Sequence, residues 1–273
     1  MYLFYTMKYL LLSFLLLLMV LPACAQHENW DTYMARYGSK PGSVLVDMGL
    51  MATAPQKLLP YLVITGPHAK NCYNPQGIPD TGEINKMETI LGVAGGVLSG
   101  ATARKLAGTF TYNCERLNYY YVQDTTAIRK SLNRVYQTYY PDYKYTLKIK
   151  YDPQWVSYRS FLYPDSSASA WMANNKAMTS LLVAGDDLQT PRSINHTLYF
   201  MDDSGRTEFA RYAASNGYAV VSTNKSPNEG LAYELVIGRT GRVILDSIVT
   251  MESDLTRVAK PLKGYYKGWD AKK

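Results

Sequence analysis

The segment from residue 143 to residue 151 carries the clearest structural signal in the chain. Two sets of side chains alternate along it, Tyr143, Tyr145, Leu147, Ile149 and Tyr151 against Lys144, Thr146, Lys148 and Lys150. A period of two places one set on each face of a β-strand. We therefore expect a strand with one buried face and one wet, basic face.

The segments before this strand predict how its sheet is built. Turn residues at Gly38–Gly42 and Ala54-Pro55 separate the expected strands, and apolar residues recur at helical spacing over 83–102 and from Ile128 to Tyr139. The expected strands are 32–37, 43–50, 58–65, 109–114 and 118–123. A leading hairpin followed by β-α-β-β-α-β predicts a ferredoxin-like sheet with two helices on one face.

Two compositional features of this first region need an interpretation. Gly92, Gly96 and Gly100 repeat at every fourth residue of the expected helix, and we interpret them as a close contact between helix and sheet. The chain has 25 tyrosines, among them Tyr119-Tyr120-Tyr121. Exposed aromatic rings on a sheet could stack RNA bases, but half-wet strand faces and protein interfaces are the favoured interpretation.

A second unit is expected after Tyr163–Ser167, where a proline precedes small polar residues. Its first helix, about 168–183, should turn Trp171, Met178, Leu181 and Leu182 inward. The expected elements after it are a strand at 194–200, a helix through Phe209 and Tyr212, a strand at 231–237, and a helix from Ile248 to Leu262. The predicted fold is α+β, with two ferredoxin-like antiparallel sandwiches over 26–165 and 166–273.

Residues 1–25 have the pattern of a bacterial export signal. Lys8 precedes an apolar run from Tyr9 to Leu21 that is too short for a usual membrane-spanning helix. Ordinary cleavage around Ala23-Cys24-Ala25 and lipidation of Cys24 are both compatible with this pattern, and lipidation is favoured. The sequence therefore predicts a periplasmic protein or a membrane-anchored lipoprotein of a bacterial envelope, touching the membrane only through a lipid on Cys24.

The compartment outside the bacterial cytoplasm is oxidising, so disulfide bonds between the other cysteines would persist there. Cys72 and Cys114 remain as an even pair without the spacing of a zinc or thioredoxin-like motif, so a structural disulfide or two buried thiols are expected. The formal charge of +7 includes no polybasic run, so no nucleic-acid partner is expected.

The best acid/base cluster consists of Asp186, Asp187, Arg192 and His196. These groups could orient a water molecule or a phosphate. A structural interpretation is favoured, because His196 is in phase with the apolar residues of its strand and Gly185-Asp186-Asp187 resembles a helix stop. Asp187 and Arg192 bracket the turn and are expected to pair. With three histidines in the chain and no phosphate-binding motif, neither a metal nor a cofactor is predicted.

Two resemblances to known families cover most of the chain. Gly185–Leu188, Pro191-Arg192, His196 and the ending Gly268-Trp269 resemble the RraB family, regulators of ribonuclease E activity, over about 166–273. That resemblance implies a domain that binds a protein and performs no chemistry. The first unit resembles an uncharacterised bacterial domain that often precedes RraB-type domains, on the basis of Glu28–Asp31, Lys40–Ser43 and Tyr158–Pro164. That resemblance implies no function.

These observations favour an exported, non-catalytic module that binds an unidentified protein. Asp186, Asp187, Arg192, His196 and Trp269 are its predicted binding residues. Direct regulation of ribonuclease E is the alternative for a cytoplasmic protein, and an enzyme built on the four acid/base residues is the remaining class.

Overall fold

The computed structural model describes residues 28–225 and 230–271, so Cys24 and the predicted export signal lie outside the described residues. Contacts divide the chain into two compact units, with main parts Val44–Tyr163 and Pro164–Lys273, and group Thr32–Ser43 with the second. Among the described residues, no helix combines the length and apolar character that a bilayer crossing requires.

The larger sheet has six strands in the order β1-β2-β4-β5-β3-β6, and β3 to β6 belong to the first unit. Its strands are β1 (Trp30–Tyr37), β2 (Lys40–Asp47), β3 (Tyr61–Pro67), β4 (Arg104–Tyr112), β5 (Glu115–Val122) and β6 (Tyr145–Tyr151). From β3 onward the elements follow β-α-β-β-α-β, and β3 lies antiparallel between β5 and β6. The predicted ferredoxin-like arrangement is confirmed for this unit.

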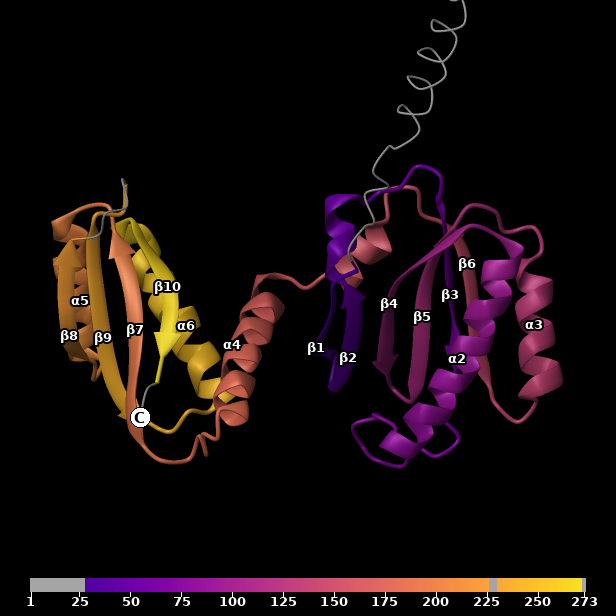
Figure 1. Ribbon diagram of the computed structural model, residues 1–273, viewed down its shortest axis with the longest axis horizontal. Helices are drawn as coiled ribbons and strands as arrows, with labels where there is room; N and C mark the ends of the chain where they lie inside the picture. The colour runs from indigo at the N-terminus through magenta and orange to yellow at the C-terminus, as the bar shows by residue number, and fades with distance from the viewer. Residues whose placement is uncertain (1–27, 226–229, 272–273) are drawn as a thin grey trace, which may run out of the picture. The chain divides into compact units, whose positions relative to one another are not determined.

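Two helices cover one face of this sheet, α2 (Thr81–Ala101) and α3 (Ile128–Tyr139), as Figure 1 shows. Ile90, Leu98 and Leu132 from these helices pack on Val63 and Tyr120 of the sheet. The alternation in β6 also has the expected effect, because Leu147 and Ile149 pack against this core while Lys148 and Lys150 are exposed.

A second core lies on the opposite face of the first sheet. The Tyr121 ring stacks on Trp155 at a centroid distance of 3.9 Å, and Trp155 donates a hydrogen bond from Nε1 to the carbonyl of Leu59 over 3.0 Å. The Tyr121 hydroxyl donates to Asp152 over 2.8 Å, and burial raises the pKa of this tyrosine. This layer includes the 3-10 helix η1 (Met48–Ala52) and the π-helical turn η2 (Tyr158–Leu162).

The interpretations of the tyrosine run and of the glycine repeat in the first unit are both wrong. Tyr119, Tyr120 and Tyr121 are 7%, 3% and 0% exposed, so they are core residues and form neither a base-stacking platform nor a half-wet face. Gly92, Gly96 and Gly100 face open space, and the close contact is made by Gly95, where a Cβ would lie 2.7 Å from the Tyr120 hydroxyl. A spacing of four marks a helix face but does not tell which face is buried.

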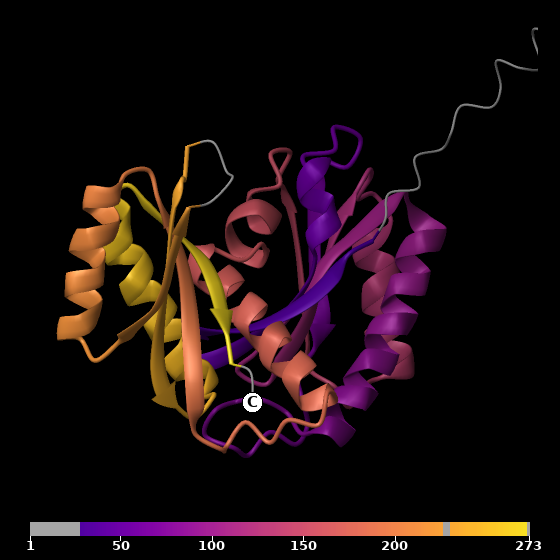
Figure 2. The ribbon, with the colours of Figure 1, turned by 60° about the vertical axis from the view of Figure 1, so that its left-hand side comes forward.

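The second unit contains a four-stranded antiparallel sheet with the order β10-β7-β9-β8. Its strands are β7 (Arg192–Phe200), β8 (Ala219–Lys225), β9 (Tyr233–Gly241) and β10 (Gly264–Asp270). Figure 2 shows α5 (Asp203–Ser215) and α6 (Leu245–Ala259) on the same face of the sheet, where Phe209 and Leu255 pack on Phe200. The order of elements is again ferredoxin-like, as predicted.

The helix α4 (Ser166–Val183) precedes this β-α-β-β-α-β core. Met178 and Leu181 pack on a small cluster around Ile194 and Ile248, but Leu182, expected on the inner side, is 53% exposed. The helix predicted at about 168–183 is therefore confirmed, but the prediction that Leu182 faces inward is wrong.

Candidate functional site

Arg192, at the start of β7, is a buried guanidinium with several internal partners. Its Nη2 forms an ion pair with Asp186 Oδ2 at 2.9 Å, and the two side chains are 7% and 10% exposed. Nε donates to the carbonyl of Ala271 over 2.9 Å, and Nη1 donates to the carbonyl of Thr190 over 3.3 Å. Arg192 therefore fastens the loop before β7 to the end of β10.

The acidic partner that the structure shows for Arg192 is Asp186, and Asp187 forms hydrogen bonds within the turn before β7. Asp187 Oδ1 accepts hydrogen bonds from the amides of Gln189 and Thr190 at 3.1 and 3.2 Å, and Oδ2 accepts from the Thr190 hydroxyl at 2.8 Å. Asp186 Oδ1 likewise accepts from the Leu188 amide at 2.7 Å. An aspartate that accepts from amides two or three residues ahead stabilises a turn, so both aspartates stabilise the turn before β7, and Asp186 also pairs with Arg192.

His196 lies fully buried on the helix-covered face of β7, in phase with Ile194 and Leu198. Its Nδ1 and the Tyr266 hydroxyl are 2.9 Å apart and share a hydrogen bond, whereas Nε2 has no partner within the described chain. Burial lowers the pKa of His196 to about 4, and the nearby Asp270 opposes this shift. The ring is therefore neutral at pH 7 and has no access to a substrate.

Trp269 belongs to a polar chain that joins three elements of the second unit. Its Nε1 donates to Asn174 Oδ1 over 2.5 Å, and Asn174 Nδ2 donates to Glu252 Oε2 over 2.5 Å and to the carbonyl of Ala170 over 2.8 Å. These contacts connect β10, α4 and α6, because Asn174 lies on α4 and Glu252 on α6. Trp269 thus holds α4 against the sandwich.

The predicted binding residues do not converge on one point. Arg192 and His196 lie four residues apart on one strand, which separates them by about 13 Å along β7. Asp186 stays at the Arg192 end, and Trp269 is opposite His196 in the register of β10. Each side chain is engaged inside the protein, so the set acts as a structural framework for the second unit. No group of three or more metal-ligating side chains occurs among residues 28–225 and 230–271.

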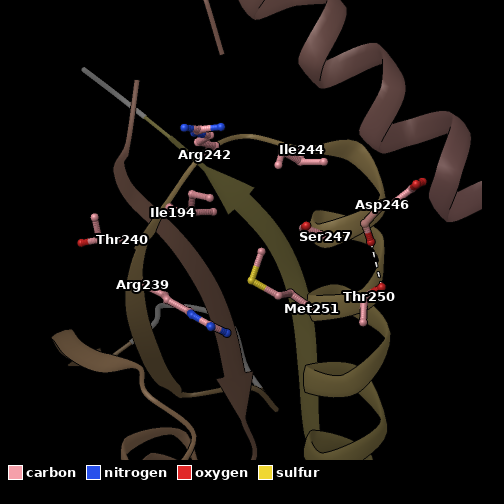
Figure 3. Close-up of a pocket in the computed structure, with 10 residues that line it drawn as sticks. Ile194, Arg239, Thr240, Arg242, Ile244, Asp246, Ser247, Thr250 and Met251 are labelled. Atoms are coloured by element: carbon pink, nitrogen blue, oxygen red, sulfur yellow. Dashed lines mark hydrogen bonds between the residues drawn. The ribbon is translucent and has the colours of Figure 1, made fainter. Parts of the chain in front are cut away.

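A cleft in the second unit lies away from these residues, between the end of β9 and the start of α6 (Figure 3). It is a cleft of about 530 Å³ with Ile194 and Met251 among its apolar residues and Arg239 and Arg242 among its polar ones. Sequence reasoning missed these arginines. The available signal was two arginines three positions apart between a strand and a helix.

In the first unit, Cys72 and Cys114 form a disulfide with their Cα atoms 5.8 Å apart. The bond joins the loop before α2 to the turn between β4 and β5. His68 in the same region lies 2.7 Å from Glu115 Oε1 through its Nε2, and Thr146 also donates to that carboxylate over 2.6 Å. These contacts tie the loop to the sheet.

Each unit matches the model of a known family. Residues 28–163 match the model of a family of unknown function, DUF695, and residues 171–271 match the model described as regulator of ribonuclease activity B. Both predicted resemblances are therefore confirmed. No curated protein matches the chain.

Two solved structures are similar to the chain at low identity. One is an unknown protein from Galdieria sulphuraria, at 12% identity and a TM-score of 0.21, and the match covers 78% of this chain and 98% of that chain. The other is provisionally described as a glycine cleavage system transcriptional repressor, at 15% identity and a TM-score of 0.22, with the same coverage of both chains.

Proposed function

We propose that this chain, a DUF695-type unit followed by an RraB-type protein-binding unit, is an exported, non-catalytic protein whose second unit binds another protein of the bacterial envelope. One observation supports the absence of catalysis. Every residue of the best acid/base cluster bonds inside the fold, with Arg192 on Asp186, Asp187 on its own turn, and His196 neutral in the core. The family of the second unit supports the choice of a protein as partner.

Location decides between this proposal and direct regulation of a ribonuclease. The apolar run from Tyr9 to Leu21 supports export, and an exported copy does not meet a cytoplasmic ribonuclease. Labelled palmitate should enter the wild-type protein in cells and should not enter Cys24→Ala. Soluble mature protein beginning at Gln26 would contradict lipidation, and protein retained in the cytoplasm with its first residues intact would favour the ribonuclease regulator.

Partner binding can be assigned to one unit with a matched pair of crosslinkers. Tyr265 in the second unit is 57% exposed and Tyr139 in the first is 64% exposed, so a photoreactive phenylalanine can replace either without entering a core. In intact cells, the probe at position 265 should crosslink to a discrete envelope protein and the probe at position 139 should not. Equal crosslinking from both positions, or none from position 265, would contradict the assignment to the second unit.

Absence of catalysis has its own test. The purified mature protein is expected to show no turnover in a screen of phosphoesters, peptides and glycosides. Turnover that His196→Asn abolishes, at an unchanged melting temperature, would establish an enzyme and overturn the proposal.

A further inference from the structure

The cleft at the start of α6 combines positive charge with an apolar floor. Arg239 stands opposite Ile194 in the β7–β9 register, and its Cζ lies 6.0 Å from the centre of the Tyr218 ring. Arg242 follows three residues later, on the loop that enters α6. Figure 3 shows the two arginine side chains at separate ends of the cleft, with Ile194 and Met251 between them.

The two guanidinium groups are not neutralised by the protein. Among the described residues, neither Arg239 nor Arg242 forms an ion pair, whereas Arg192 pairs with Asp186. Asp246 also lines the cleft, but Figure 3 shows its side chain turned away from both arginines. The site therefore offers two guanidinium groups without an acidic partner to an incoming anion, and Arg239 also forms a hydrogen bond with the Tyr218 side chain. Guanidinium groups match the geometry of carboxylate and phosphate oxygens.

The local backbone adds to this preference. The helix α6 begins after Ile244 without a side-chain cap, so its first amide groups keep a donor capacity that no side chain satisfies. Ser247, at the start of α6, also lines the cleft. A volume of about 530 Å³ is within the range of small-molecule sites, which typically join an apolar lining to a few polar groups.

We propose that this cleft binds an amphiphilic oxyanion, a carboxylate or phosphate group on an apolar chain. The arginines hold the head group, and Ile194 and Met251 contact the chain. This site is distinct from the buried framework of Arg192 and His196, and it goes beyond the proposed binding of a protein partner.

Calorimetric titration with three probes of equal chain length tests the proposal. Octanoate and octyl phosphate should bind saturably with a Kd below about 1 mM, and the probe with the higher affinity identifies the head group. Octanamide has the same chain without the charge and should bind at least tenfold more weakly. Equal binding of octanamide, or no saturable binding of either anion, would overturn the proposal.

Variants then locate the binding. Arg239→Gln and Arg242→Gln should each weaken the binding of the better anion at least threefold, and the double variant at least tenfold. Arg257→Gln is the matched control, because Arg257 lies farther along α6, outside the cleft, and pairs with Asp254 at 3.3 Å. An equal loss in Arg257→Gln would show general charge attraction and overturn the site.

Two further measurements keep the result interpretable. The Met251 methyl resonance should shift with the same Kd in the wild type, and melting temperatures should show that the variants are folded. An unshifted Met251 resonance during saturable binding would place the ligand elsewhere and contradict the proposal. None of these outcomes depends on the crosslinking from position 265, so the two proposals fail independently.

Discussion

Burial of the His196 ring without a partner for Nε2 makes the stability of the fold depend on pH. The pKa of the ring is about 4 in the folded protein, against 6.5 for a free histidine. Below pH 6.5 the unfolded chain therefore takes up a proton that the folded chain does not bind. Stability should fall as the pH falls from 6.5 toward 4, by about 3 kcal/mol at the lower end.

Urea unfolding of the wild type and His196→Leu at several pH values tests this expectation. The variant should lose part of its stability at pH 7, because the Tyr266 hydroxyl loses its partner, but its stability should change less between pH 6.5 and 4.5. Leu198→Val is the control, since Leu198 is buried on the same strand and does not titrate, so the slope should stay unchanged. Parallel curves for the wild type and His196→Leu would contradict the assignment.

The Asp186–Arg192 pair allows a second test with single residues. Removing one partner leaves a buried charge unpaired, so Asp186→Ala or Arg192→Ala alone should cost about 3 kcal/mol. The double variant should cost clearly less than the sum of the two. The same cycle on the exposed pair Arg257–Asp254 should give a coupling below about 1 kcal/mol. Additive losses at Asp186 and Arg192 would show that the buried contact is not coupled.

Among the elements, α2 contains neighbouring glycines in opposite environments. Gly96→Ala meets no atom within 4 Å and should raise the unfolding free energy by about 0.5 to 1 kcal/mol through helix propensity. Gly95→Ala places a Cβ 2.7 Å from the buried Tyr120 hydroxyl and should lower it by about 1 kcal/mol or more. Chemical denaturation compares the two variants directly, and stabilisation by both would show that the helix-to-sheet contact is loose.

How well the elements could be predicted depended on their place in each sheet. Alternation in β6 and helical spacing in α3 were readable, because each buries one face. The strands β8 and β10 were not assigned from the sequence. Most of β8 is exposed, and Gly268 interrupts β10. Hydrogen bonds to β9 and β7 make these segments strands, and such bonds produce no alternation of apolar and polar side chains in the sequence.

The site was less predictable than the fold for a related reason. Residue type identified Asp186, Arg192 and His196 as polar groups of interest, but only the register shows that they face inward to different partners. Three bonds complete the network, and they join residues 70 to 95 positions apart: His196–Tyr266, Trp269–Asn174 and Asn174–Glu252. A pattern within one short segment of sequence cannot predict hydrogen bonds between residues so far apart.

For the whole molecule, the Cys72–Cys114 disulfide is the strongest covalent constraint in the described chain. It spans 42 residues of sequence, and the loss of such a closed loop should cost about 3 to 4 kcal/mol through the added freedom of the unfolded chain. Cys72→Ser, Cys114→Ser and the double variant should lose the same amount. Reductant should lower the unfolding midpoint of the wild type and leave the double variant unchanged, and a wild type insensitive to reductant would contradict this contribution.

The edges of the two sheets differ in how they resist aggregation. In β6 the exposed Lys148 and Lys150 place charge along an outer strand, a common protection against unwanted pairing with another sheet. The outer strand β8 instead shows Val220 and Val221, 48% and 54% exposed, beside an open row of backbone donors and acceptors. At high concentration, β8 is where intermolecular strand addition should begin, and a lysine at position 221 should delay the onset of fibres.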